Sequence, residues 1–343
     1  MHDLVDALVN RRRPVELDMC RSFWARLQDK QVDRAEAAAL LAALSTTMPD
    51  PDTVVTFLAS LEERRQASGI SFPGAANIVG TGGGPGTFNI STAAAFVAAA
   101  MGVRVVKTGS RANSSKVGSI NLLDRLGIPL TRSYEETGER LDEFGIAFAG
   151  YFVYPVELTR LARTVLPLDM RAVGRFVNTV GPFLAAIPVS AQITGVSDPA
   201  HLPTMRRLAG GQQGKRVWLC SNELGADELL SCTTNQMYDT DSGEFVIRPQ
   251  ELGLGGGELS DLRGAPQDDQ VITHFQALLA GHAPHPAVAT VCLNAAALAV
   301  AAGTVPNLVT GVRDARAAVH EGAAAELVAR MRERTPAEVS ARG

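Results

Sequence analysis

A glycine-rich stretch at residues 78–92 constrains this chain more than any other feature of its sequence. An apolar pair, Ile78 and Val79, suits the end of a strand, and five glycines follow within residues 80–86. A polar cluster then leads into an alanine-rich segment, 93–100, with strong helix propensity. Glycines let backbone N–H groups approach an anion, and a helix start adds unpaired N–H groups and a positive dipole end. This order predicts a phosphate-binding loop, although a tight strand-to-helix connection fits the local sequence equally well.

A second loop of similar chemistry follows the next expected strand. Residues 107–119 hold three cations, four serines and two glycines, and an amphipathic helix is expected at 120–126. Cationic side chains and backbone N–H groups of such a connection suit a second anion. Two loops of this kind predict a substrate that carries more than one phosphate group.

Between about residues 71 and 165 the sequence alternates strand, turn and helix, which is typical of parallel βαβ units. The expected strands cover residues 77–79, 103–106, 146–148, 192–196 and 216–220, with a strand pair within 237–247. The pair surrounds a turn in which Asp239 and Asp241 fit turn chemistry better than calcium binding. Ligands gather at the carboxyl ends of parallel strands, so both loops are expected at one edge of the sheet.

The first 70 residues differ, because their apolar residues recur at helical spacing without a strand pattern. We therefore expect an α/β protein in two parts. A small all-helical domain covers residues 1–70, joined by helices from about 160–188. A larger α/β domain covers residues 71–159 and 189–343, with a central, mostly parallel sheet flanked by helices. An apolar content of 46% over 343 residues supports a large core.

Asp227 and Glu228 follow the strand expected at 216–220 and form the acidic pair best suited to a cation. Proteins usually bind Mg²⁺ through one or two carboxylates together with substrate phosphates. An acidic first turn of a helix is the competing interpretation, slightly favoured by the local sequence alone, and Glu223 is a competing ligand. The two phosphate loops favour the metal, because a polyphosphate site in an acidic protein needs a cation to offset charge.

Net charge and cysteine usage exclude several classes of protein. A net charge of −4 argues against a protein that coats nucleic acid. The four cysteines are scattered without metal-ligand spacing, which indicates free thiols in a reducing compartment. No signal peptide pattern and no apolar run long enough to cross a bilayer are present in the sequence, so we expect a cytoplasmic protein.

Taken in order, these motifs resemble those of the anthranilate phosphoribosyltransferase family and, more distantly, of pyrimidine nucleoside phosphorylases of the same fold. The likeness runs over nearly the whole chain. The segments that carry it are residues 80–83, 87–92, Lys107-x-Gly109-x-Arg111, residues 114–119, Gly225-x-Asp227-Glu228, residues 262–264 and residues 293–296.

The resemblance implies a homodimer that transfers 5-phosphoribose from PRPP to anthranilate, or to a related aromatic or heterocyclic acceptor, with Mg²⁺ and release of pyrophosphate. It also assigns roles by matching position. The residues implied to bind PRPP are Gly80, Gly83, Thr87, Asn89, Ser91, Thr92, Lys107, Ser115 and Ser119. Those implied to be catalytic are Lys107 and Arg111, and those implied to bind the metal are Ser91, Asp227 and Glu228. Those implied to bind the acceptor are Gly80, Thr108, Ser110 and Arg171, with Arg175 as the alternative to Arg171.

The chain departs from the family pattern in both loops. The first loop has Gly84-Pro85-Gly86 where the family usually carries an acid within Gly-Gly-Asp-Gly. In the second, Thr108 and Ser110 replace the histidine and asparagine of Lys-His-Gly-Asn-Arg, which lie near the aromatic acceptor in the family. We therefore expect PRPP recognition, with a rebuilt pocket for anthranilate or with another aromatic nucleophile. The alternatives are a nucleoside phosphorylase-like enzyme and a catalytically silent homologue that binds a ligand or nucleic acid.

Overall fold

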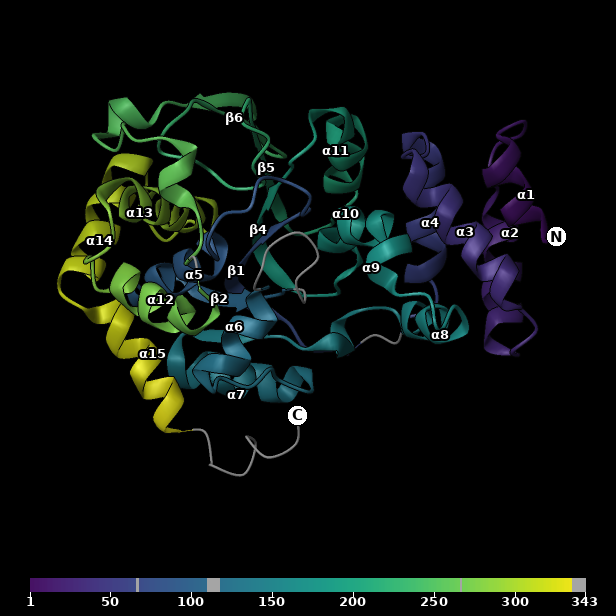
Figure 1. The fold of residues 1–343 in the computed structure, drawn as a ribbon, viewed down its shortest axis with the longest axis horizontal. Coiled ribbons are helices and arrows are strands. Elements are labelled where there is room, and N and C mark those ends of the chain that lie inside the picture. The colour runs from purple at the N-terminus through teal and green to yellow at the C-terminus, as the bar shows by residue number, and fades with distance from the viewer. Residues whose placement is uncertain (66–67, 110–117, 266, 335–343) are drawn as a thin grey trace. The chain divides into compact units, whose positions relative to one another are not determined.

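The structure, a computed structural model, describes residues 1–65, 68–109, 118–265 and 267–334. The chain divides into two compact units (Figure 1). A helical unit consists of residues 1–69, 151–186 and 200–211, and an α/β unit consists of residues 70–150, 187–199 and 212–343. The boundaries of the helical unit differ from the expected ones in that residues 151–159 and 200–211 also belong to it.

The helical unit packs around a chain of buried aromatic side chains. Its helices are α1 (Asp3–Asn10), α2 (Leu17–Gln28), α3 (Arg34–Thr46), α4 (Pro51–Glu62), α8 (Val156–Thr164), α9 (Met170–Val173), α10 (Arg175–Leu184) and α11 (Leu202–Gly210). Trp24 packs edge-to-face on Phe57, and Phe57 on Phe176, with ring centroids 5.2 and 5.6 Å apart. Residues from distant parts of the sequence thus share one core, which explains why α10 belongs to this unit.

The α/β unit is built on a seven-stranded sheet. Its strands are β1 (Phe72–Gly80), β2 (Arg104–Lys107), β3 (Ile146–Phe148), β4 (Val189–Gly195), β5 (Arg216–Asn222), β6 (Asn235–Asp239) and β7 (Gly243–Ile247). Their order is β3-β2-β1-β4-β5-β6-β7, and the first five are parallel while β6 and β7 are antiparallel. The predicted α/β fold class, with its mostly parallel sheet flanked by helices, is confirmed.

Helices cover the sheet of the α/β unit (Figure 1). They are α5 (Ile90–Ala100), α6 (Ser119–Leu126), α7 (Tyr134–Phe144), α12 (Val271–Leu279), α13 (His285–Ala301), α14 (Leu308–His320) and α15 (Ala323–Glu333). Alternate residues of β1 and β4, such as Ile78 and Ile193, join the same buried cluster as α5 and α13. The small alanine side chains of those two helices let them pack closely, so the strand ends and the first turn of α5 are held in fixed places.

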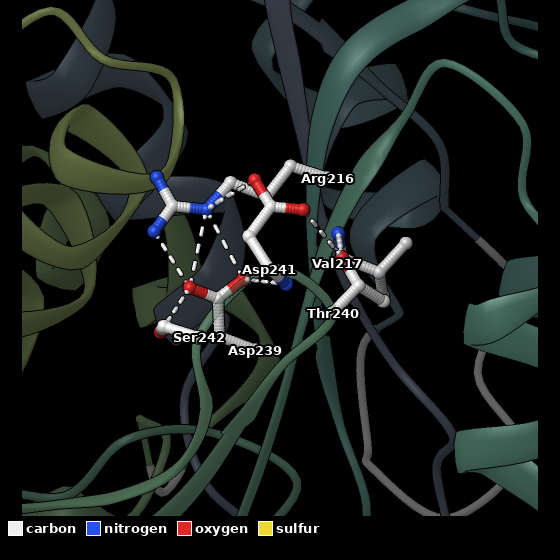
Figure 2. Close-up of polar contacts among 6 residues, drawn as sticks. All are labelled: Arg216, Val217, Asp239, Thr240, Asp241 and Ser242. Carbon is white, nitrogen blue, oxygen red and sulfur yellow. Dashed lines mark hydrogen bonds and ion pairs between the residues drawn. The ribbon is translucent and has the colours of Figure 1, made fainter.

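A polar cluster closes the antiparallel edge of this sheet, where β6 turns into β7 (Figure 2). The Asp239 carboxylate accepts hydrogen bonds from Arg216 Nη2 at 2.6 Å and from Ser242 Oγ at 2.7 Å. The backbone N–H of Asp241 donates to Asp239 Oδ1 at 3.1 Å. Asp239 therefore organises a hairpin turn, as the sequence predicts.

Candidate active site

Four parallel strands deliver their carboxyl ends to one edge of the sheet. Strand β1 ends at Gly80, β2 at Lys107, β4 at Gly195 and β5 at Asn222. Gly80 lies opposite Gly195 in the β1–β4 register. The loops that follow these strands therefore start beside one another, in the position where α/β sheets bind ligands.

Asp227 lies directly over the paired glycines at the ends of β1 and β4. A Cβ atom at Gly80 would fall 2.0 Å from Asp227 Oδ2, and one at Gly195 would fall 1.6 Å from the Asp227 carbonyl oxygen. Gly82 N donates a hydrogen bond to Asp227 Oδ2 at 2.7 Å. Only glycine leaves room for this approach, so the sequence of both strand ends fixes where the carboxylate lies.

The segment that carries the acidic pair is a loop, since residues 223–234 contain no helix. The interpretation of Asp227 and Glu228 as a helix first turn is therefore wrong. The backbone of this loop is instead held by the side chains of three buried asparagines.

The three asparagines bind successive parts of the acidic loop. Asn222 Nδ2 donates to the Glu228 carbonyl at 2.9 Å. Asn294 Nδ2, from α13, donates to the Leu229 carbonyl at 2.7 Å, and its Oδ1 accepts from the Leu229 N–H at 3.2 Å. Asn235 makes the same pair of bonds to Leu230, both at 2.9 Å. This bracing gives Asp227 and Glu228 a fixed backbone although they lie in a loop.

The two carboxyl groups are electrostatically unsatisfied. Burial raises the pKa of Asp227, and burial together with the charge of Asp227 raises the pKa of Glu228 well above its ordinary value. No ion pair to either carboxyl group occurs within the described part of the chain. A pair of hard oxygen ligands in this state fits a divalent cation, whose charge would offset the repulsion between them.

The cation would need further ligands. Across the described residues, no group of three or more histidine, cysteine, aspartate or glutamate side chains is placed to hold a metal ion. The acidic pair therefore suits a metal that arrives with oxygen atoms of a substrate, as Mg²⁺ does with phosphates.

Lys107 connects the second loop to the first. Its side chain is buried, and its Nζ donates to the Ile78 carbonyl at 2.8 Å and to Ser91 Oγ at 3.3 Å. Burial lowers its pKa to about 8, and the charges of Glu228 and Asp227 limit that decrease. The structure thus brings together Gly80, Ser91, Lys107, Asp227 and Glu228 at one strand edge.

The other residues predicted to bind PRPP lie around this group. Gly83 has a φ of +85°, a conformation that favours glycine, and Thr87 and Asn89 lead into α5. Thr92 lies in the first turn of α5, and its buried hydroxyl has no hydrogen-bond partner among the described residues. Ser119 begins α6, where a Cβ at position 109 would fall 2.2 Å from its Oγ.

The predicted acceptor residues are less well placed by the structure. Thr108 is buried, and its hydroxyl accepts a hydrogen bond from Asn77 Nδ2 at 3.1 Å. Arg171 belongs to α9 of the helical unit, and Arg175 is exposed at the start of α10. Those predicted residues that lie outside the described part are Ser110, Arg111 and Ser115, together with the side chain of Arg171. The acceptor assignments therefore stay predictions.

Gly195 and the three asparagines were not predicted from the sequence as residues of the site. A glycine inside a strand often marks the close approach of another backbone, and Gly195 at the end of β4 carries that signal. Asn222 and Asn235 had no such signal, and Asn294 was marked only by its place in the family-like segment 293–296, because the partners of all three are backbone groups brought near by the fold.

Within the described part of the chain, no helix is both long and apolar enough to span a membrane.

Known proteins are similar to this chain in both sequence and fold. Residues 73–325 match the glycosyl transferase family, a/b domain. The anthranilate phosphoribosyltransferase of Methylorubrum populi is 31% identical over 92% of this chain and 93% of its own length. That of Thermus thermophilus is 34% identical over 88% of this chain and 89% of its own length.

Two solved structures agree with these relatives. The crystal structure of the Thermus thermophilus enzyme has a TM-score of 0.75 at 30% identity, and the match covers 96% of this chain and 98% of that one. A Saccharomyces cerevisiae anthranilate phosphoribosyltransferase in complex with PRPP and Mg shares the fold, with a TM-score of 0.80 at 20% identity and 96% coverage of both chains. The chain described here belongs to the anthranilate phosphoribosyltransferase family, within the glycosyl transferase family whose α/β domain it contains.

Proposed function

We propose that this protein transfers 5-phosphoribose from PRPP to an aromatic amine, with anthranilate as the first candidate, and releases pyrophosphate. The observation that carries the proposal is the meeting of the glycine loop, Lys107 and the acidic pair at one strand edge. Family membership supports the same reaction. The protein is then a pentosyltransferase of tryptophan biosynthesis or of a related pathway.

In this proposal the strand edge binds the diphosphate and stabilises its departure. The N–H groups of Gly83, Gly84 and Gly86 and the start of α5 contact phosphate oxygens, because the N–H groups of Thr81 and Gly82 already donate to Gly195 and Asp227. Lys107 and Arg111 contribute positive charge as negative charge grows on the leaving pyrophosphate. Such groups act by position and charge, without a covalent nucleophile.

The metal is proposed to be Mg²⁺, held by Asp227 and Glu228 with Ser91 nearby. When bound, it supplies positive charge that neutralises the pyrophosphate of PRPP. The fit rests on the unsatisfied carboxyl pair and on the two glycines that make room for it.

The residues proposed to bind the acceptor are Gly80, Thr108, Ser110 and Arg171, with Arg175 as the alternative to Arg171. An arylamine nitrogen has a free lone pair, so the reaction requires no strong general base. The replacement of the family's histidine by Thr108 supports a pocket that differs from that of the relatives, for anthranilate itself or for a related ring.

The test is to incubate the protein with PRPP, Mg²⁺ and anthranilate, and to measure pyrophosphate release. A panel of other aromatic amines, and of heterocyclic acceptors, follows in the same assay. We expect pyrophosphate release that requires Mg²⁺ and one acceptor of this class. Release of a free base from nucleosides and phosphate, without use of PRPP, would contradict the proposal and favour a phosphorylase.

We also propose a homodimer in a reducing, cytoplasmic compartment. Exposed apolar side chains on the helical unit, including Tyr151, Val156 and Leu166, support a subunit contact there. The four free cysteines support the compartment. Light scattering during gel filtration tests the dimer, and a monomer at micromolar concentration would contradict it.

A further inference from the structure

Residues 195–197, where the chain leaves β4, lie between the glycine loop and strand β5. The Thr81 N–H donates to the Gly195 carbonyl at 2.9 Å, and the Val196 N–H donates to the Cys220 carbonyl at 2.8 Å. The chain after Gly195 is thus attached on one side to the strand that leads into the glycine loop. On the other side it is attached to the strand that leads into the acidic loop.

Ser197, the next residue, holds the glycine loop directly. Its Oγ donates to the Gly82 carbonyl at 2.6 Å, and its backbone N–H donates to Thr81 Oγ1 at 3.2 Å. The N–H of Gly82 is bound by the Asp227 carboxylate at 2.7 Å. Gly82 is therefore fixed from two sides, by Asp227 at its N–H and by Ser197 at its carbonyl.

The loop needs such external bonds because its own sequence does not restrict it. Gly82 and Gly83 have φ values of +71° and +85°, and both belong to the run of five glycines. Glycine loses more conformational freedom on ordering than any other residue. A loop of this composition is ordered before ligand binding only if neighbouring groups hold it.

We propose that Ser197 is a positioning residue, which holds the glycine loop in its PRPP-binding conformation before PRPP arrives. The inference rests on the proposed function and adds a residue that no loop motif contains. Loss of the Ser197 hydroxyl allows the loop to sample other conformations, so PRPP then has to order it on binding. The substitution therefore lowers the affinity for PRPP, while the rate of reaction in the bound complex is retained.

The test compares Ser197→Ala with Ser197→Thr and with a matched control in β4, the strand that precedes Ser197. Ser190 lies near the start of β4, and its Oγ accepts a hydrogen bond from the Gly74 N–H at 2.9 Å. Ser190→Ala therefore also removes one serine-to-backbone bond, but at the other end of the strand. We expect Ser197→Ala to raise the KM for PRPP about fivefold, with kcat nearly unchanged. We expect Ser197→Thr, which keeps a hydroxyl, and Ser190→Ala to retain the wild-type KM.

A urea titration of all variants separates positioning from stability. Similar unfolding midpoints for Ser197→Ala and Ser190→Ala, with a raised KM in the first alone, support the proposal. An unchanged KM in Ser197→Ala, or an equal rise in Ser190→Ala, overturns the proposal and leaves the proposed function intact. Failure of the wild-type protein to use PRPP with any acceptor overturns the proposed function, and the role of Ser197 with it.

Discussion

The carboxylates near the two ends of strand β5 differ in the partners that they bind. At its start, Arg216 and Ser242 donate hydrogen bonds to Asp239, whose side chain is fully buried (Figure 2). Beyond its end, Asp227 accepts one backbone hydrogen bond and lies beside a second acid, Glu228. The first carboxylate forms an ion pair with Arg216, whereas the second pair has no ion-pair partner among the residues that the structure describes.

Their pKa shifts follow this difference. Burial alone would raise the pKa of Asp239, but the hydrogen bonds from Arg216, Ser242 and the Asp241 N–H outweigh it and lower the pKa. Burial raises the pKa values of Asp227 and Glu228, and Lys107 offsets only part of that effect. A buried carboxylate that is paired with a cation and hydrogen-bonded indicates a structural role. A buried acidic pair with a fixed backbone and raised pKa values indicates a site suited to bind a cation.

Replacing both acids of the unsatisfied pair should have the largest effect on function. We expect Asp227→Ala with Glu228→Ala to lower PRPP-dependent pyrophosphate release by about 10²–10³-fold, because the site loses the charges that hold its cation. Circular dichroism checks that the variant is folded. In contrast, Asp239→Ala should retain the activity of the folded protein. Equal losses of activity in both variants would remove the distinction between the two ends of β5.

Filling the space under Asp227 should have the next largest effect. A methyl group at Gly195 would fall 1.6 Å from the Asp227 carbonyl oxygen, so Gly195→Ala must displace the acidic loop. We expect PRPP-dependent activity to fall by about 10²-fold, as displacement of a site by about 1 Å can cause. Gly210→Ala is the matched control, because a Cβ there meets no atom within 4 Å. Wild-type activity in Gly195→Ala would show that the position of Asp227 does not matter.

Removing the satisfied carboxylate should instead affect stability. We expect Asp239→Asn to lower the free energy of unfolding at pH 7 by about 2 kcal/mol, since hydrogen bonds to a charged group are lost. Urea denaturation followed by tryptophan fluorescence measures this change. A loss of less than about 0.5 kcal/mol, the level typical of a surface substitution, would contradict a structural role for Asp239.

The effect of Asp239 should also depend on pH. Because its folded-state pKa is lowered, its contribution is present above the unfolded-state pKa of about 3.9 and is lost as pH falls through the lower folded-state value. The difference in Tm between wild type and Asp239→Asn should therefore be largest near pH 7 and shrink as the pH falls below about 4. A difference that grows in acid would have the wrong sign for a carboxylate stabilised by Arg216.

The smallest effect is expected from neutral replacements of the unsatisfied pair. Asp227→Asn with Glu228→Gln keeps the shapes of the side chains and removes their charge repulsion. Without Mg²⁺, we expect this variant to be as stable as the wild type or more stable by up to about 1 kcal/mol. Thermal unfolding in a chelator measures it. A loss of several kcal/mol would place Asp227 and Glu228 among the structural acids, with Asp239.

Much of the α/β unit could be predicted from the sequence, because its signals are local. Strands β1 to β5 each contain a short apolar or alternating stretch bounded by glycine or polar turns, and the parallel order then brings Gly80 and Lys107 to one edge. The turn at Asp239 was predictable in the same way, since its partners are within a few residues or on the adjacent strand.

The supports of the site were not predictable, because they depend on contacts between distant segments. Asn294 reaches Leu229 across 65 residues, and Ser197 reaches Gly82 across 115 residues. The loop conformation of residues 223–234 was also not predicted. Local acid content favoured a helix start at Asp227, but side-chain hydrogen bonds from three asparagines hold that segment as a loop.

Calorimetry of PRPP binding, with and without Mg²⁺, tests most directly whether the acidic pair holds a cation with the substrate. The wild-type protein and Asp227→Asn with Glu228→Gln are titrated side by side, after both are shown to be folded. We predict binding heat for the wild type that requires Mg²⁺, and affinity lowered at least tenfold in the variant. Equal Mg²⁺-dependent affinity in both proteins would contradict the assignment of Asp227 and Glu228 as the cation site.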